Sequence, residues 1–421
     1  MPAGEIIAGD IIMKFLIQKF GGTSLVTQEL REQVAAKAID AREEGYTPVL
    51  VVSAIGRKND PFATDTLINY VRQVHREIES REMDMLMACG EIISGVVMAG
   101  TFQKLGYSSI FLNGAQAGII TDNNFNDARI LKVQPENIIK HAREGKIVVV
   151  AGFQGRTGDG DITTLGRGGS DTTAAALGVA LGAEFVDIYT DVEGIMTADP
   201  RIVENARLRD IVTYDEICQL AHEGAKVVHP RAVEIVMQKN IPMRVKCTFS
   251  NAPGTLVTST GEVYRGTIDI TRDRTITGIT QIPNLTQFRI PLDNGSGGLV
   301  VQRRLFKALA LAGISLDFIN VYPERVVFTV KDDMTSKVLQ VIETTGINNV
   351  EYTAGCAKVA AVGAGMTGLP GIMSAIVEAL TRDDIQILQS NDSYTTIWLL
   401  VKKEDMEKAV RALHRQFALA D

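Results

Sequence analysis

Near-continuous apolar runs of six or seven residues alternate with longer helical stretches over the first 250 residues of the chain. This alternation constrains the fold most, because a strand that is apolar on both faces needs cover on both sides. The predicted strands are residues 14–19, 48–53, 147–152, 184–190 and 241–246. The predicted helices are residues 24–44, 82–105, 171–181 and 213–222. The pattern predicts a three-layer αβα domain with a mostly parallel sheet, whose ligands gather at the carboxyl ends of the strands.

The character of the chain changes after residue 250, and the remainder contains an internal repeat. Residues 306–330 align without gaps with residues 377–401, an offset of 71 residues. Each copy reads as helix, strand, turn and strand, with a strand before it (277–281 and 358–362) and a helix after it. Two α+β segments can match weakly by chance, but the gap-free register favours two similar modules that pack together.

Length and composition set the class of protein. A chain of 421 residues predicts two to three domains, and we place them at residues 13–250, 276–345 and 346–421, with a connector at 251–275. The net charge is −7 with no long basic run, which argues against a nucleic-acid partner. Four cysteines without a CxxC pair suit a reducing compartment. No apolar run approaches 18 residues and no signal peptide is evident, so we expect a cytoplasmic protein without a membrane partner, with Met13 as an alternative start.

Several common catalytic motifs are absent from the sequence. It has no GxxxxGK[ST] loop, no protein-kinase catalytic-loop or DFG signature, and no HExxH. The five histidines form no metal-ligand pattern, so we predict no protein-held metal site. A GxGxxG after the first strand is also missing, which counts against an NAD-dependent dehydrogenase.

The first glycine-rich turn follows the first predicted strand. Lys19 ends that strand, Gly21 and Gly22 let the backbone approach an anion, and the helix expected from Ser24 would offer free N–H groups. Together with the Lys19 charge this combination suits a phosphate, with Thr23 in the same turn. A plain strand-to-helix turn with a surface lysine is the alternative.

The second glycine-rich turn, residues 166–171, precedes the alanine-rich helix. Its arginine, Arg167, has a planar fork that matches a carboxylate, which suggests recognition of a small acid. Ser170 or Asp171 could instead cap the helix. Two such turns on one sheet make a ligand site more credible than either does alone.

Three further segments admit both structural and functional interpretations. Thr190 and Asp191 leave the strand at 184–190, where Asp and the following glycine suit turn geometry as well as function. Lys226 follows a helix end, where a lysine is favoured for electrostatic reasons. Glu91 lies in an otherwise apolar helix and either faces solvent or is buried and holds a cation.

These motifs together resemble the aspartokinases of the amino-acid-kinase family. The resemblance rests on KFGGTS at 19–24, CGE at 89–91, LGRGGSDTTA at 165–174, TDVEGIMTADPR at 190–201 and GAKVVHPRA at 224–232. It covers nearly the whole chain, and the C-terminal repeat looks like the paired regulatory ACT modules of these enzymes, which are ferredoxin-like (βαββαβ). Any one of these motifs would be weak evidence, but their combination in this order is specific.

The resemblance implies a reaction and a set of roles. ATP would phosphorylate the side-chain carboxylate of L-aspartate to 4-phospho-L-aspartate, with Mg²⁺ carried by ATP, at the head of the pathway to lysine, diaminopimelate, threonine and methionine. Lys19 and Asp171 would be catalytic. The substrate side would comprise Thr64, Glu91, Arg167, Gly168, Gly169 and Ser170. The nucleotide side would comprise Lys19, Gly21, Gly22, Thr23, Thr190, Asp191, Met196, Arg201 and Lys226.

The resemblance also implies regulation. An end-product amino acid (lysine, threonine or diaminopimelate) would bind the first module at Ser315, Leu316 and Asp317, opposite residues 295–298, although Asp317 could merely terminate a loop. The modules of this family pair across subunits, which implies a homo-oligomer. Met196 stands where many relatives have tyrosine, and the loop at 56–61 is similar to that of diaminopimelate-responsive enzymes. Other amino-acid kinases, such as glutamate 5-kinase or uridylate kinase, and a non-catalytic amino-acid sensor remain alternatives.

Overall fold

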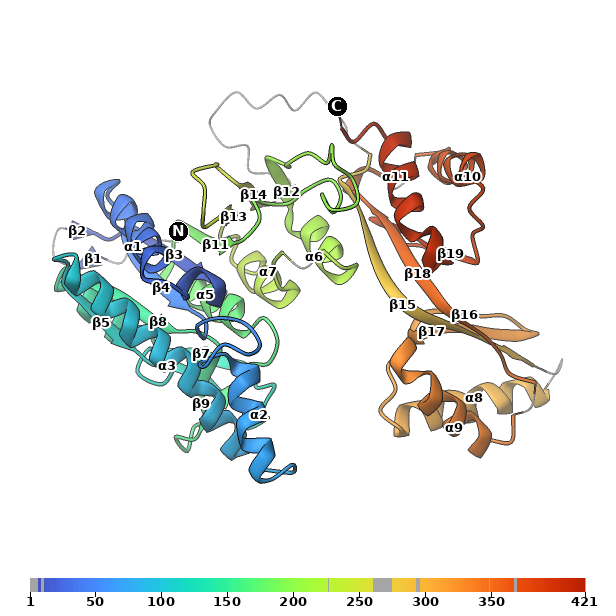
Figure 1. Cartoon of the computed structure of the whole chain (residues 1–421), viewed down its shortest axis with the longest axis horizontal. Coiled ribbons are helices and arrows are strands. Elements are labelled where there is room, and N and C mark those ends of the chain that lie inside the picture. The colour runs from blue at the N-terminus through green and yellow to red at the C-terminus, as the bar shows by residue number, and fades with distance from the viewer. Residues whose placement is uncertain are drawn as a thin grey trace. The chain divides into compact units, whose positions relative to one another are not determined.

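The computed structural model describes residues 7–8, 11–225, 227–259, 275–292, 296–347, 349–366 and 369–420. The chain forms two compact units, each of which is built from three separate segments (Figure 1). The first unit contains Met1–Ile195, Leu208–Ala221 and Lys226–Asp269, and the second contains Met196–Arg207, His222–Ala225 and Ile270–Asp421. The second unit therefore takes two short segments from within the predicted catalytic domain.

An eight-stranded sheet forms the centre of the first unit, in the order β12-β14-β13-β11-β3-β4-β8-β5. All neighbouring strands are parallel except β13 and β14, so the predicted α/β class with a mostly parallel sheet is confirmed. The strands are β3 (Phe15–Phe20), β4 (Thr47–Val52), β5 (Ser109–Leu112), β8 (Ile147–Ala151), β11 (Phe185–Thr190), β12 (Ile211–Thr213), β13 (Met243–Cys247) and β14 (Thr255–Thr258).

Helices cover both faces of this sheet, as the apolar strands require. On one face α1 (Gln28–Glu43) and α3 (Ser80–Lys104) pack on Leu50, Val52 and Val149. On the other, α5 (Gly169–Leu181) is buried almost throughout and packs so closely that a Cβ at Gly178 would lie 2.4 Å from Val186. The remaining helices are η1 (Gly22–Leu25), α2 (Thr64–Val74), α4 (Glu136–Arg143), α6 (Tyr214–His222) and α7 (Pro230–Met237).

The sequence did not predict α2, α4, α7, β5, β12, β14 or the short strands of this unit. A four-stranded sheet, in the order β10-β9-β6-β7, contains β6 (Ile119–Thr121), β7 (Ile130–Val133), β9 (Gln154–Arg156) and β10 (Ile162–Thr164). A two-stranded ribbon contains β1 (Ile7–Ala8) and β2 (Ile11–Ile12). Strand β14 lies inside the predicted connector at 251–275, so the central sheet continues past residue 250.

By length and composition α3 could also cross a membrane, which the sequence analysis did not anticipate. Half of its most apolar window is buried inside the protein, and its inward side chains include Met98 and Phe102 of the core. It is the only such helix in the part of the chain that the structure describes.

The second unit confirms the internal repeat. Its six-stranded sheet has the order β16-β17-β15-β18-β20-β19, with the first strands of the two copies, β15 (Gly278–Pro291) and β18 (Glu351–Val362), paired at its centre. The first copy continues with α8 (Ser296–Leu311), β16 (Asp317–Val321), β17 (Arg325–Lys331), η2 (Asp332–Met334) and α9 (Thr335–Thr344). The second continues with η3 (Ala364–Met366), α10 (Ile372–Arg382), β19 (Gln389–Asp392), β20 (Thr396–Lys402), η4 (Lys403–Asp405) and α11 (Met406–Gln416).

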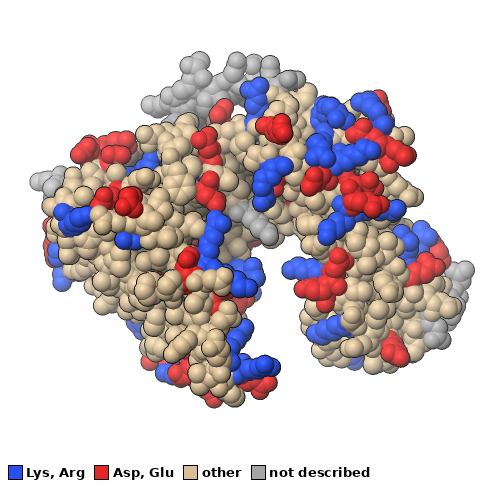
Figure 2. Space-filling view, in the orientation of Figure 1, with Lys and Arg blue, Asp and Glu red and all other residues tan. Residues whose placement is uncertain are grey.

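Each copy has its own helical layer and apolar core. In Figure 1, α8 and α9 lie beside one end of the β15–β18 pair, and α10 and α11 lie beside the other end. The core of the second copy includes Ala198 and Val203, which come from the segment Met196–Arg207. Around α10 and α11 basic and acidic side chains are intermixed, with no patch of a single sign on the face shown in Figure 2.

The two edge strands of this sheet also meet. The Gln389 side chain of β19 donates to the Phe318 carbonyl oxygen, at 2.7 Å, and to Asn320 Oδ1, at 2.5 Å, in β16. Phe318 itself has a positive φ of 54°, within an irregular stretch of the β16–β17 pairing. The predicted packing of two similar modules is therefore present as one sheet with linked edges.

Candidate active site

The first glycine turn and the alanine-rich helix meet at the carboxyl ends of the central strands. Lys19, near the end of β3, places its Nζ 2.8 Å from Asp171 Oδ1 in the first turn of α5. Asp171 Oδ2 also accepts a hydrogen bond of 3.2 Å from the backbone N–H of His229. Both members of the ion pair are largely buried, with 15% and 12% of their side chains exposed. The two predicted catalytic residues are therefore in direct contact.

The turn after β3 lies against the turn after β4. A Cβ at Gly22 would lie 2.1 Å from the Ala54 carbonyl oxygen, and the Gly56 N–H donates to the Gly22 carbonyl at 3.0 Å. Only glycine fits at this position. The expected helix from Ser24 is wrong in detail, because a short 3₁₀ turn, η1, holds Thr23 and Ser24, and α1 begins at Gln28. The backbone near Gly21 therefore presents a turn instead of the end of a long helix.

The second glycine turn is shaped by close packing. Gly168 has a φ of 68°, and a Cβ there would lie 2.1 Å from the His229 ring. A Cβ at Gly169 would lie 2.6 Å from Phe153. Gly168 is the N-cap of α5 and no side chain caps this helix, so Ser170 and Asp171 do not have the capping role considered as an alternative.

Arg167 lies at the exposed tip of the same turn. Among the residues that the structure describes, no ion pair involves its guanidinium group. An arginine with this freedom remains available to bind a carboxylate.

Glu91 is buried, with only 3% of the residue exposed, so the solvent-facing alternative is wrong. Its Oε1 accepts a hydrogen bond of 3.0 Å from the Ala54 N–H, and in this structure Oε2 has no hydrogen-bond partner. Burial raises the pKa of Glu91 to about 8. A buried carboxyl group with an unpartnered oxygen is suited to receive a cationic group.

Thr64 lies close to this region through the packing of α2 on α3. It is the first residue of α2 and is half-buried. A Cβ at Gly90 would lie 2.8 Å from the Ala54 Cβ and 3.1 Å from the Phe62 carbonyl, so Gly90 brings the chain before Thr64 against α3.

The end of β11 contacts the loop after β4. Thr190 Oγ1 donates to Asp191 Oδ1 at 3.2 Å, and Asp191 Oδ2 forms an exposed ion pair of 2.9 Å with Arg57. Arg57 was not among the predicted site residues, and the sequence analysis used its loop only to compare subtypes. A basic residue that directly follows a glycine at a strand end was the available signal.

Three nucleotide-side candidates lie outside the described part of the first unit. Met196 and Arg201 lie in the second unit, where Arg201 forks onto Asp199, with hydrogen bonds of 3.0 and 2.7 Å. The neighbouring Thr197 Oγ1 lies 2.9 Å from His414 Nε2 of α11. Lys226 lies outside the described residues.

The predicted effector residues include an ionic cluster. Asp317 Oδ2 lies 2.6 Å from Lys358 Nζ, which also lies 2.9 Å from Glu223 Oε2. Lys358 and Glu223 are buried, whereas 54% of the Asp317 side chain is exposed. Burial would lower the pKa of Lys358, but the carboxylates, Glu223 foremost, raise it above its usual value. Ser315 and Leu316 precede β16, and Gly295, expected opposite them, lies outside the described residues.

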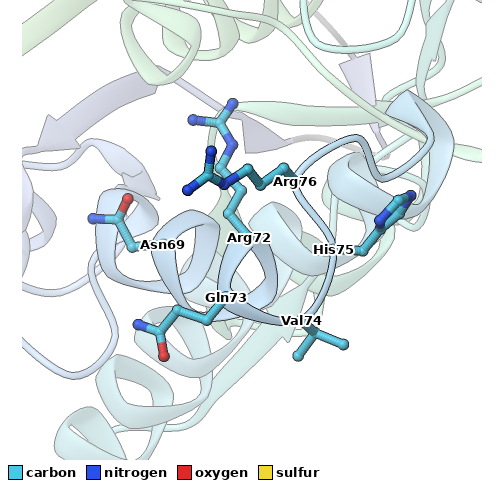
Figure 3. Close-up of a pocket in the computed structure, with 6 residues that line it drawn as sticks. All are labelled: Asn69, Arg72, Gln73, Val74, His75 and Arg76. Atoms are coloured by element: carbon cyan, nitrogen blue, oxygen red, sulfur yellow. The ribbon is translucent and has the colours of Figure 1, made fainter.

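A surface hollow at the end of α2 is separate from these groups. It is lined by Asn69, Arg72, Gln73, Val74, His75 and Arg76 (Figure 3). All six residues come from one helix end and its continuation, and the hollow contains none of the predicted site residues.

The chain is similar to known proteins over both of its regions. A model described as the amino acid kinase family matches residues 14–247, and one described as an ACT domain matches residues 351–415. Aspartokinase 1 of Bacillus subtilis (strain 168) is 49% identical over 408 residues, covering 97% of this chain and 100% of that protein. An aspartokinase of Geobacillus stearothermophilus is 38% identical over 414 residues, covering 97% of this chain and 98% of that protein.

Two solved structures share the fold of the whole chain. Aspartokinase III of E. coli, in complex with aspartate and ADP, superposes with a TM-score of 0.76 at 24% identity, covering 96% of this chain and 99% of that chain. The aspartate kinase of Clostridium acetobutylicum superposes with a TM-score of 0.76 at 24% identity, covering 96% and 100%.

Proposed function

We propose, on the premise that this chain belongs to the aspartokinases of the amino acid kinase family, a mechanism for its aspartate kinase activity. The γ-phosphoryl group of ATP passes to the side-chain carboxylate of L-aspartate, which yields 4-phospho-L-aspartate and ADP. The observation that carries the mechanism is the Lys19–Asp171 ion pair of 2.8 Å, which joins the two glycine turns. The paired ACT modules regulate this activity.

The nucleophile needs no general base. A carboxylate is already ionised at neutral pH, so one of its oxygens attacks the γ-phosphorus directly, and the bond from that phosphorus to the β–γ bridging oxygen breaks. Catalysis then depends on alignment and on neutralising negative charge. Lys19 supplies that positive charge, Asp171 orients its ammonium group, and Gly21 and Gly22 let the phosphates approach the backbone.

Two groups recognise the α-amino acid part of the substrate. The unpartnered oxygen of Glu91 accepts the α-ammonium, and the Arg167 fork holds the α-carboxylate. Thr64, Gly168, Gly169 and Ser170 line the same side, whereas Thr23, Thr190, Asp191, Met196, Arg201 and Lys226 serve the nucleotide.

Mg²⁺ enters this site with ATP. The described residues contain no group of three His, Cys, Asp or Glu side chains arranged to hold a metal ion. Magnesium is commonly held by substrate phosphates and water, with one or two carboxylates. Asp171, which contacts Lys19 from the first turn of α5, and Asp191, directly after β11, are carboxylates that would complete such a ligand set, so the residues present fit an ion that the nucleotide carries. When bound, the ion would neutralise phosphate charge.

The test is a hydroxamate assay, because hydroxylamine traps acyl phosphates, together with a measurement of ADP release. With ATP and Mg²⁺, L-aspartate should give hydroxamate, and L-glutamate and UMP should give little product. Hydroxamate from glutamate or phosphorylation of UMP would favour another amino-acid kinase. Nucleotide binding without turnover of any of the three substrates would favour a sensor. The same reactions with Lys19→Ala control for contaminating kinases.

An end-product amino acid is the proposed effector, bound at Ser315, Leu316 and Asp317. Support comes from Asp317, whose half-exposed carboxylate already holds an ammonium group, that of Lys358. The effector ammonium would take that place. Isothermal titration with lysine, threonine and diaminopimelate should show which one binds, and Asp317→Ala should weaken its binding about tenfold, the loss expected for a hydrogen bond to a charged group. Retained binding would clear Asp317 of this role.

Location and assembly complete the proposal. We place the enzyme in the cytoplasm, where ATP and free amino acids are available, as a homo-oligomer formed through its ACT modules. Sedimentation velocity over a range of concentrations tests the assembly, and a concentration-independent monomer would contradict it.

A further inference from the structure

Asp84 is a buried carboxylate two turns before Glu91 on the same helix, α3. It is fully inaccessible to solvent, and no ion pair involves it among the described residues. Seven residues span nearly two turns of an α-helix, so Asp84 and Glu91 lie on the same side of α3. The sequence analysis did not single out Asp84.

Donors from the loop at Asn126 and from Thr164 at the end of β10 saturate this carboxylate. The Asn126 N–H donates to both oxygens at 3.0 Å, the Thr164 N–H donates to Oδ2 at 2.7 Å, and Thr164 Oγ1 donates to Oδ1 at 2.7 Å. Burial raises the pKa of Asp84, and these hydrogen bonds oppose the rise. A buried carboxylate that accepts four hydrogen bonds holds its donors in one arrangement.

Both donor segments hold the turn that carries Arg167. Thr164 ends β10, two residues before the turn begins at Gly166. Asn126 and Asp127 lie against Gly166, where a Cβ would be 2.6 Å from Asp127 Oδ1. The Ala128 N–H donates to the Thr164 carbonyl at 2.9 Å and joins the two segments. Asp84 therefore holds in place the two segments that support the turn of Arg167.

Helix α3 thus carries Glu91, which is proposed to bind the substrate ammonium. Through Asp84 it also anchors the turn of Arg167, which is proposed to bind the substrate carboxylate. We propose that Asp84 is a positioning residue that sets the separation between the Glu91 carboxylate and the Arg167 guanidinium. That separation selects an α-amino acid, whose ammonium and carboxylate groups are attached to one carbon atom. The inference rests on the substrate roles given to Glu91 and Arg167 in the proposed function.

The direct test replaces Asp84 by Asn, which preserves size but turns an acceptor into a donor that faces backbone N–H groups. Leaving buried donors unpaired corresponds to about a 5- to 100-fold effect. The KM for L-aspartate should rise by that factor, with the KM for ATP and kcat within about threefold of wild type. Glu82→Gln is the matched control, because Glu82 is an exposed carboxylate of the same helix. It should leave both KM values unchanged.

A double-mutant cycle separates positioning from a general loss of structure. If Asp84 acts through Arg167, adding Asp84→Asn to Arg167→Ala should change the aspartate KM less than twofold further. The proposal would be overturned if the aspartate KM of the double variant rose by the product of the two single-variant factors. It would also be overturned if Asp84→Asn raised the KM for ATP as much as the KM for aspartate.

A second variant covers the case in which Asp84→Asn does not fold. Thr164→Val removes one donor at constant shape, and it should raise the aspartate KM in the same direction by a smaller factor. A folded Thr164→Val enzyme with an unchanged KM would also overturn the proposal. The wild-type reaction is the reference arm: if the wild type does not phosphorylate L-aspartate, the proposed function fails, whereas an active wild type with unaffected variants rejects only the role of Asp84.

Discussion

Lys19 is the residue on which the proposed chemistry depends most. Its ammonium group is held by Asp171 at a distance of 2.8 Å, so it is oriented before any substrate binds. Groups oriented in advance toward developing charge contribute strongly to catalysis. Lys19→Ala should therefore lower kcat by about 10²-fold or more in the hydroxamate assay.

The control for this prediction is Lys14→Ala, which removes an exposed lysine just before the same strand. Its kcat should match that of the wild type. If Lys19→Ala also retains wild-type kcat, Lys19 has no catalytic role and the mechanism must be revised.

Glu91 leads to a prediction about pH. Because burial raises its pKa to about 8, Glu91 is mostly neutral at pH 7 in the free enzyme and ionises as the pH rises through 8. A substrate ammonium binds the ionised form better, so kcat/KM for aspartate should increase with pH up to about 8 and then level off. A rate profile between pH 6 and 9 checks this, and Glu91→Gln should remove the rise. An unchanged rise in Glu91→Gln would assign it to another group.

The raised pKa of Glu91 also makes the stability of the folded protein depend on pH. The folded state of the free protein keeps the Glu91 proton above the pH at which the unfolded chain loses it. Stability from this group is therefore fully present below about pH 4.5, the ordinary value, and is lost as the pH rises toward 8. The melting temperature of the wild type should fall over that window relative to that of Glu91→Gln. If the melting temperatures of the wild type and Glu91→Gln change with pH in the same way, Glu91 is not a buried, neutral carboxyl group.

Residue roles could be anticipated from the sequence only where a residue lies in a distinctive motif. Lys19 lies near the end of β3, just before a glycine turn, and Asp171 lies in the first turn of α5, just after a glycine-rich turn. Strand ends and helix N-termini are positions at which α/β proteins bind ligands, so both residues could be singled out. Asp84 and the His229 N–H carry no comparable local signal, and that of Arg57, a basic residue directly after a glycine, was not used. Their partners are 42 to 134 residues away or on the backbone, so their importance depends on tertiary contacts.

At the scale of elements, Lys358 joins three parts of the second unit. Its ammonium group, in β18, contacts Asp317 of β16 and Glu223 of the segment His222–Ala225. Removing one member of a buried ionic cluster leaves an uncompensated charge, which costs about 3 kcal/mol. Lys358→Gln should lower the free energy of unfolding by roughly that amount in thermal or urea denaturation, with the exposed side of Asp317 reducing the effect.

Arg382→Gln is the matched control, because it breaks an exposed pair with Glu378 one turn away in α10. Exposed helical pairs contribute only about 0.3–0.5 kcal/mol. Equal destabilisation by the two substitutions would show that the Lys358 cluster adds nothing beyond a surface pair.

Elements were predictable in proportion to their length and burial. The strands from Phe15 to Phe20 and from Ile147 to Ala151 are apolar and nearly continuous, and both were predicted within one residue. Strands of three or four residues, such as Ile162–Thr164 and Thr255–Thr258, contain too few positions to show a period. The helix predicted from Thr213 begins with a capping box, in which the Thr213 N–H donates to Glu216 Oε2 at 2.8 Å and the Glu216 N–H donates to Thr213 Oγ1 at 3.2 Å.

At the scale of the whole molecule, the internal repeat could be predicted from the sequence, but the division of the chain into two units could not. A fixed offset of 71 residues also relates β17 to β20 and η2 to η4, so one local pattern specifies both modules. The assignment of Met196–Arg207 and His222–Ala225 to the second unit depends instead on long-range packing, such as that of Val203 in the core of α10 and α11. The exact boundary between the two modules stays a prediction.

A chain that ends at Asp269 should therefore be less stable than the full chain. It keeps the segment Met196–Arg207 but lacks its packing partners, which exposes apolar groups such as Ala198 and Val203. Exposed apolar surface favours association. Size-exclusion chromatography should show aggregated material, and serine at both positions should partly restore the monodisperse form. A truncated chain as stable and monodisperse as the full one would contradict this expectation.

The alternation of the two units along the chain also limits how related enzymes can exchange their control properties. A chimera with a single junction near residue 270 would combine one parent's Ile270–Asp421 with the other parent's Met196–Arg207 and His222–Ala225. Lys358 would then face a Glu223 position inherited from a different parent, and α11 would face a foreign Thr197. Recombination that preserves a working regulatory unit has to transfer all three pieces of chain together.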